Sequence, residues 1–212
     1  MKSPEPRRAS AHTTSPAREE LLRAAEELLA SRRPDDITSR RLADTASVNL
    51  GAVAYYFDSK DRLLAEAMVG VARRLISPVV SELTDTDREP VAVLLSGIQR
   101  LYATLEENRE RLPAYLHALA AAGTDPAIAA DVNQLRREVT AALADSINGQ
   151  LDQGQLPNWV RAEPMADLIV AVVHGVVVTA ATDPGHSDES AVASQFAQLL
   201  LNIRAVPPSR GQ

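Results

Sequence analysis

The sequence contains no cysteine, which excludes a disulfide framework and any metal site built from thiolates. Histidine is also scarce, and the four histidines show no spacing typical of metal ligands. The sequence contains no GxSxG, P-loop or GxGxxG motif. We therefore expect no metal site, no cofactor and no enzymatic activity. The histidines are His12, His117, His174 and His186.

Aromatic residues are few as well, at 3% of the chain, although 45% of the residues are apolar and many of these are alanine and leucine. Such a composition favours helices over β-sandwiches or barrels, because alanine and leucine are strong helix formers. A chain of 212 residues is long enough to bury a sizeable core. The composition therefore predicts an all-α fold.

Long apolar runs are also missing. The N-terminal residues 1–16 are polar and lack the apolar segment of a signal peptide. The longest apolar stretch, residues 168–181, is too short and too interrupted to span a bilayer. We expect no membrane partner and a cytoplasmic localisation.

The charge is acidic overall, with a formal net charge of −6, which on its own argues against a nucleic-acid partner. The distribution is uneven, however. Residues 1–63 hold 11 Lys and Arg against 10 Asp and Glu, whereas residues 64–212 hold 11 against 18. This asymmetry permits a DNA-binding surface near the N-terminus.

Several segments show clear local patterns. Residues 1–14 and 206–212 have the composition or position typical of disordered tails. Ser15 and Pro16 form a plausible start for a first helix that ends at Pro34. Residues 127–151 carry apolar side chains every three or four positions, and this predicts a long amphipathic helix. Further helices are expected after Pro164 and over residues 188–204.

Residues 37–64 carry the strongest functional pattern. Thr38 is a typical N-cap flanked by apolar residues at N′ and N4, so a helix is expected from about Ser39 to Ala46. Asn49 is a second cap candidate after a turn at residues 46–48, and Ser59 is a third. Two short helices joined by so tight a turn have the form of a helix-turn-helix.

This segment resembles the DNA-binding segment of TetR-family transcriptional regulators. The resemblance implies an N-terminal three-helix DNA-binding domain at residues 15–64, followed by a larger helical ligand-binding and dimerisation domain at residues 65–205. It also implies a repressor that a small effector releases from a palindromic operator, with an activator or a constitutive DNA-binding protein as the alternatives. The matching residues are Thr38, Leu42, Ala43, Ala46, Val48, Gly51, Val53, Tyr56, Phe57, Ser59, Lys60 and Leu63.

The resemblance implies that double-stranded DNA is contacted from both short helices and from the start of the next one. Arg40 would reach a base edge, and polar residues around it would hold phosphates. Helical periodicity turns Val53 and Phe57 inward and leaves small residues towards the groove. Ser47 replaces the usual glycine of the turn, and Ala54 replaces a usual tyrosine. The expected DNA contacts are Thr38, Ser39, Arg40, Asn49, Leu50, Gly51, Ala52, Ala54, Tyr55, Tyr56 and Lys60.

Helix-turn-helix proteins bind two half-sites as two-fold dimers, so we expect a homodimer. The two apolar C-terminal helices are the natural interface, with Val172, Val176, Phe196 and Leu200 as candidates. An effector pocket is expected among the helices between residues 91 and 180. Because few charged residues interrupt their apolar faces, we expect a largely apolar ligand. The candidate lining residues are Leu101, Tyr102, Leu105, Tyr115, Leu119, Trp159 and His174.

Other interpretations of these residues are possible. The two arginines at 40–41 could belong to an ordinary solvated face, and the aromatic cluster at 55–57 could be core packing. His174, in the most apolar helix, could be a core or interface histidine. The whole chain could also be a helical protein-interaction adaptor, or a ligand-binding protein without DNA regulation. An adaptor would not shift a palindromic duplex in a sequence-dependent way.

Overall fold

The computed structural model describes residues 15–85 and 87–183, together with the single residues 191, 195 and 198. Within this part of the chain all regular structure is helical, as the composition predicts. The predicted tails and most of the predicted helix at residues 188–204 lie outside the described residues. The helices are α1 Pro16–Ser31, α2 Ser39–Thr45, α3 Gly51–Phe57, α4 Lys60–Leu83, α5 Pro90–Glu107, α6 Leu112–Ala122, α7 Pro126–Asp152 and α8 Ala162–Thr182, with 3-10 turns at Pro34–Asp36 and Arg109–Arg111.

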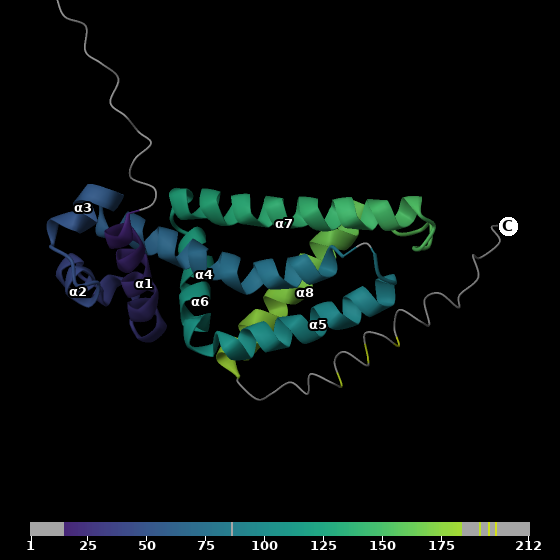
Figure 1. The fold of residues 1–212 in the computed structure, drawn as a ribbon, viewed down its shortest axis with the longest axis horizontal. Coiled ribbons are helices and arrows are strands. Elements are labelled where there is room, and N and C mark those ends of the chain that lie inside the picture. Colours follow the sequence, from purple (N-terminus) through teal and green to yellow (C-terminus); the bar gives the residue numbers. More distant parts are fainter. Residues whose placement is uncertain (1–14, 86, 184–190, 192–194, 196–197, 199–212) are drawn as a thin grey trace, which may run out of the picture.

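The first three helices form a small unit at one end of the molecule, on the left in Figure 1. The Thr38 side chain accepts a hydrogen bond from the Arg41 backbone N–H at 3.2 Å, so it caps α2 as predicted. Ser59 caps α4 in the same way through the Arg62 N–H at 3.1 Å. Buried leucines of α1 and α2 meet the inner face of α3 in one core. Local caps therefore set the helix ends, and apolar burial holds the three helices together.

Helix α4 connects this unit to the rest of the protein. Its 24 residues run without interruption through the domain boundary that we expect at residue 64. Pro78 lies inside the helix and lacks an N–H to donate, yet α4 continues to Leu83. Buried residues on both sides of the proline, Ile76 and Val79, anchor the helix in the core. Helix α4 is therefore a rod of about 36 Å that belongs to both regions.

The C-terminal helices pack around the second half of α4. Helix α7 lies along one side and α5 along the other, while α6 crosses near the small N-terminal unit and α8 passes diagonally between them (Figure 1). Helix α7 spans residues 126–152, which confirms the long amphipathic helix predicted from periodicity. A second apolar cluster, which includes Leu143, Ile147, Ala166 and Val170, joins α7 to α8.

Helix α8 differs from the sequence expectation in one respect. Its 21 residues are long and apolar enough to cross a membrane by length and composition, so the expectation that this stretch is too short was wrong. Among the described residues, the helix packs against α7, α6 and α5, and its other face, which we name the open face, carries exposed apolar side chains. Leu168 is 56% exposed and Val178 is 37% exposed. Exposed apolar side chains that lie together on one helix face are typical of an interaction surface.

Candidate functional site

The exposed face of α3 is small and flat, with one large aromatic side chain. Val53 and Phe57 point into the core, as the helical periodicity predicts. Tyr55 is 65% exposed and Leu50 is 50% exposed, so both side chains project into solvent. Gly51 and Ala54 are exposed between them. A backbone that carries only small residues can approach another surface closely.

Ala52 does not share this face. It was expected to point towards a DNA groove, but it is only 7% exposed and belongs to the core. The reason is geometric, because α3 packs against α1, α2 and α4 at once and so buries more than the single stripe that periodicity marks. The expected orientation of Ala52 was therefore wrong.

The turn between α2 and α3 is held by its own polar atoms. Asn49 accepts a hydrogen bond from the Ala52 N–H at 3.0 Å, which satisfies one free donor at the start of α3. Ser47 has a φ of 54°, a left-handed conformation that favours glycine. Ser47, which stands in place of the usual glycine of the turn, therefore carries backbone strain. The turn is longer than expected, because α2 ends at Thr45 and α3 begins at Gly51.

Helix α3 is fixed to α1 by two contacts that the sequence did not reveal. The Ser15 hydroxyl, expected to cap α1, instead hydrogen-bonds the Tyr56 hydroxyl at 2.8 Å and makes no cap bond. The Arg18 guanidinium lies 4.9 Å from the centre of the Phe57 ring, in cation–π geometry. Arg18 also pairs with Glu66 of α4. These contacts orient α3 relative to the start of α4.

The basic residues next to α3 differ in their surroundings. Arg40 is exposed on the first turn of α2, as are Thr38 before it and Arg41 after it, whereas Ser39 is half-buried. The Lys60 ammonium is 25% exposed and lies 3.4 Å from the Pro34 carbonyl oxygen and 3.3 Å from an Asp61 carboxylate oxygen. Lys60 is therefore held close to the protein surface, while Arg40 can reach further out.

An apolar cavity of about 180 Å³, partly open to solvent, lies between α4, α6, α7 and α8. Three of the expected ligand residues line it: Tyr115, Leu119 and His174. The Tyr115 and His174 rings stack with their centres 6.1 Å apart. Burial lowers the pKa of His174. A hydrogen bond with the Val170 backbone raises it, but by less than burial lowers it. The imidazole is therefore neutral at pH 7.

A smaller hollow of about 80 Å³ lies between α4, α5 and α8. Two more expected residues, Leu101 and Tyr102, line it. Leu105 is buried in the core and lines neither of the two cavities. Trp159 is 51% exposed in the loop between α7 and α8, so its expected place in the pocket was wrong. Burial of an aromatic side chain cannot be assumed for a residue in a surface loop.

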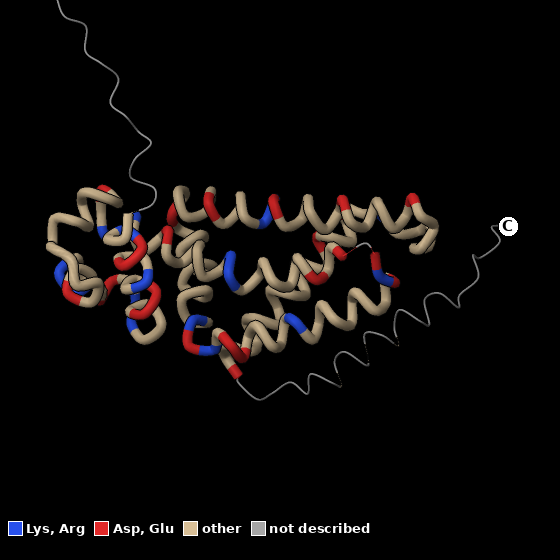
Figure 2. The backbone as a smooth tube through the Cα atoms, viewed as in Figure 1, with Lys and Arg blue, Asp and Glu red and all other residues tan. Residues whose placement is uncertain are grey.

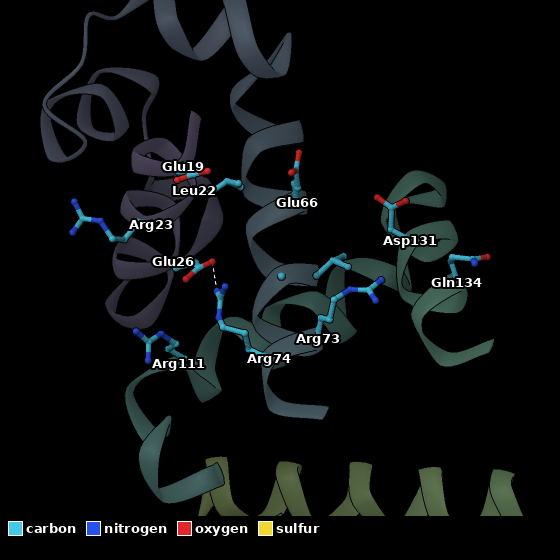
Figure 3. A pocket seen from close by; sticks show the side chains of 12 residues that line it. Glu19, Leu22, Arg23, Glu26, Glu66, Arg73, Arg74, Arg111, Asp131 and Gln134 are labelled. Atoms are coloured by element: carbon cyan, nitrogen blue, oxygen red, sulfur yellow. Dashed lines mark ion pairs between the residues drawn. The ribbon is translucent and has the colours of Figure 1, made fainter. Parts of the chain in front are cut away.

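A third, open groove of about 730 Å³ marks the junction of the two regions, between α1, α4 and α7. Its walls carry charges of both signs, and Figure 3 shows Glu26 of α1 paired with Arg74 of α4. Arg73 of α4 extends towards α7, where it pairs with Glu138 at 2.9 Å. Figure 2 shows both acidic and basic positions on these helices, with acidic positions predominating along α7. These pairs link the N-terminal unit to α7 through α4.

The candidate dimer residues have different outcomes. Val172 and Val176 are half-buried and line the smaller hollow, so their place in an interface stays a prediction. Phe196 and Leu200 lie outside the described residues. The large apolar side chains of α8 that are exposed are Leu168, which also lines that hollow, and Val178. Within the described part of the chain, His, Asp and Glu side chains form no cluster suited to a metal ion.

The chain resembles known regulators over nearly its whole length. Residues 21–67 match the family model described as bacterial regulatory proteins of the tetR family. Residues 90–204 match the model for the C-terminal region of BetI-type transcriptional repressors. No curated protein matches the sequence significantly.

Solved structures agree with these matches. A TetR transcription regulator from Haloarcula marismortui is 25% identical, with a TM-score of 0.72 over 90% of this chain and 98% of that chain. A putative TetR-family regulator from Rhodococcus sp. is 18% identical, with a TM-score of 0.69 over 90% and 99%. The fatty acid degradation regulator FadR from Bacillus halodurans is 15% identical, with a TM-score of 0.71 over 94% and 100%.

The family model for the C-terminal region alone covers more than half of the chain, and the N-terminal model coincides with the predicted helix-turn-helix. The predicted fold class is confirmed, and a DNA-binding role in place of an enzymatic one follows from the family. This chain belongs to the TetR family of bacterial transcriptional regulators.

Proposed function

We propose that the protein is a cytoplasmic repressor that binds a palindromic operator as a homodimer and leaves it when a small, largely apolar effector binds. The observation that carries this proposal is the course of α4. The first turn of α4 follows α3 directly. Later residues of α4, namely Ile76, Val79 and Leu83, line the apolar cavity. The match to the C-terminal region of BetI-type repressors supports the sign of regulation.

The exposed surface of α2 and α3 is our candidate for the DNA contact. Arg40 stands free of the surface on the first turn of α2, and a guanidinium can pair with guanine O6 and N7. Leu50 and Tyr55 project from α3 beside backbone that is open at Gly51 and Ala54. Thr38, Ser39, Asn49, Tyr56 and Lys60 would position the phosphates. Ala52 is removed from the proposed contacts because it is buried.

The open face of α8 is our candidate for the dimer interface. Leu168 and Val178 leave apolar surface in solvent, and their burial in a two-fold interface would stabilise the dimer. A dimer places two recognition helices at a fixed spacing on the same side of the DNA. Their spacing then decides whether both half-sites are bound at once.

Effector release requires that the ligand bind better to a conformation with wrongly spaced recognition helices. The apolar cavity can supply this difference in ligand affinity between the two conformations, because its wall includes the second half of α4. A shift of that segment would move the first turn of α4, because one continuous helix contains the two. Helix α3, which directly precedes that turn, would move with it. Ion pairs such as Arg18 with Glu66 and Arg74 with Glu26 would carry α1 along.

Selection of operators from a pool of random duplexes tests the proposal. The wild-type protein should enrich a palindrome and bind it at nanomolar to micromolar concentration. Tyr55→Ala removes an exposed side chain, so it should weaken binding while circular dichroism stays unchanged. Ala103→Gly is a matched control, since Ala103 is exposed on α5, away from the proposed surface. Failure to enrich any sequence would contradict the proposal.

A further inference from the structure

Tyr115, in the wall of the apolar cavity, has a buried hydroxyl without a hydrogen-bond partner among the described residues. Its side chain is only 1% exposed, and its hydroxyl makes no hydrogen bond with any residue that the structure describes. A buried hydroxyl without a partner costs free energy that neither core packing nor helix formation requires. A phenylalanine would fill the same space without this cost. The hydroxyl therefore points to a ligand contact.

The cavity that Tyr115 lines is almost wholly apolar. The other residues that line the cavity are mainly valine, leucine, isoleucine and alanine. Arg136 is the only charged side chain among those described in the lining, and its guanidinium lies 3.7 Å from an Asp167 carboxylate oxygen. Arg136 is 46% exposed, which places its charge at the mouth. Because Arg136 is already paired with Asp167, it does not require a negatively charged ligand.

His174 is the second polar side chain beside Tyr115, and it is uncharged at pH 7. Its ring stacks on Tyr115, and burial favours the neutral imidazole. The charge of Arg136 acts on His174, but Arg136 is already paired with Asp167. A carboxylate placed beside Tyr115 would therefore lose its hydration without meeting an unpaired positive charge among the described lining residues. A ligand oxygen without charge, such as a ketone or a hydroxyl, would meet no such penalty. The hydroxyl and the imidazole can both serve it, since each can donate or accept.

We propose that the effector is a neutral, compact hydrocarbon molecule with one ketone or hydroxyl oxygen, which hydrogen-bonds the Tyr115 hydroxyl inside the cavity. This inference rests on the proposed effector function and adds the chemical class of the ligand. The size agrees, since an engineered apolar cavity of about 150 Å³ holds benzene and this one measures about 180 Å³. The smaller hollow shares Val79, Leu83 and Ile169 with it and would accept a short extension.

A ligand and protein cycle tests the hydrogen bond directly. Acetophenone and ethylbenzene have nearly the same shape and differ by the carbonyl oxygen, while benzoate is an anion of similar size. Their dissociation constants are measured by calorimetry with the wild-type protein and with Tyr115→Phe. Wild-type protein should bind acetophenone about five- to tenfold more tightly than ethylbenzene, and Tyr115→Phe should remove this preference.

Two further variants locate the binding. Leu119→Trp fills the cavity and should abolish binding of both neutral probes. Ala103→Gly lies on the exposed face of α5, outside the lining of both cavities, and should leave the preference for acetophenone in place. Tighter binding of benzoate than of acetophenone would overturn the inference, and so would an equal preference in Tyr115→Phe. Absence of binding by every probe would overturn it as well.

Operator binding by the same protein preparations separates this inference from the proposed function. If the operator is bound but the Tyr115 hydroxyl has no effect on probe affinity, the ligand class is wrong and DNA regulation stands. If acetophenone binds as expected without releasing the operator, effector-dependent repression is wrong. If no operator can be selected, the proposed function itself fails.

Discussion

The two regions of the molecule obtain their functional surfaces in different ways. The N-terminal region, α1 to α3, presents side chains whose positions follow from local caps, as at Thr38 and Asn49. The C-terminal region forms its cavity from side chains of four helices that lie far apart in the sequence. A surface made from neighbouring residues can be recognised by spacing, whereas a cavity depends on how whole helices pack. Helix α4 belongs to both, and we propose that it couples one region to the other.

The largest expected effect concerns the open face of α8. Leu168→Glu places a charge on the most exposed large apolar side chain of that helix, and its burial against a partner would be costly. We expect a monomer by analytical ultracentrifugation and loss of operator binding. Val178→Glu should act in the same direction. Such a loss would show that the C-terminal region controls DNA binding through dimerisation.

Ala103→Glu provides the control, because it introduces the same charge at an exposed position of α5. It should leave a dimer that binds the operator. If Leu168→Glu also remained a dimer with normal operator affinity, the interface would have to lie elsewhere on the chain.

The next effect separates two basic residues of the N-terminal region. Arg40→Ala should cost about 1–3 kcal/mol of binding free energy and relax the preference at one base pair per half-site. Lys60→Ala should weaken all duplexes about equally and lower the salt slope by about one unit. The difference follows from exposure, since Lys60 is held at the Pro34 carbonyl and Arg40 is not.

Binding titrations against the operator and its single-base variants at several salt concentrations measure both effects. A uniform loss of affinity in Arg40→Ala, with every base preference intact, would make Arg40 a phosphate contact. Sequence would then be read by Tyr55, by the backbone near Gly51 or through DNA shape.

A smaller effect is expected at the strained turn. Ser47→Gly should raise the free energy of unfolding by about 0.5–1 kcal/mol, because glycine adopts a positive φ without the penalty that other residues incur. Urea unfolding measures the change. Ser77→Gly, at an exposed position inside α4, should lower stability by a similar amount. Equal signs for the two substitutions would argue against strain at Ser47.

The smallest effect is a pH dependence from the C-terminal region. The pKa of His174 is lowered in the folded state by burial, so the unfolded chain binds a proton first as the pH falls. The free energy of unfolding should therefore decrease below the ordinary histidine pKa of about 6.5 and level off below the folded value. His174→Gln should reduce this decrease in urea unfolding between pH 8 and 5.

His117→Gln is the comparison variant, since burial also lowers the pKa of His117, with the nearby Arg33 as a second cause. His117 is less deeply placed than His174, so its removal should have the weaker effect on the slope. Identical slopes for wild type and His174→Gln would contradict the assignment of a neutral, buried imidazole.

The helix boundaries of the N-terminal region were predictable because caps and apolar spacing are local signals. Thr38 and Ser59 cap their helices as predicted. In the C-terminal region, the helix predicted over residues 127–151 spans residues 126–152. The contact of Ser15 with Tyr56 was not predictable, since it joins residues 41 positions apart. The same applies to Ala52, whose burial depends on three neighbouring helices.

Residue type was a poor guide to the cavity. Tyr115 and His174 were among the expected lining residues, but so was Trp159, which lies exposed in a loop. Aromatic character indicates burial on average and does not say which helices will surround the ring. The lone hydroxyl of Tyr115 became informative only when the packing around it was known.

The most direct test of communication between the two regions is a measurement of acetophenone affinity for the free protein and for the protein bound to its selected operator. Linkage requires that acetophenone and operator weaken each other by the same factor, typically about five- to 150-fold for coupled sites. We expect weaker acetophenone binding in the operator complex, by the factor measured for operator release. Equal acetophenone affinities for the two forms would contradict coupling through α4.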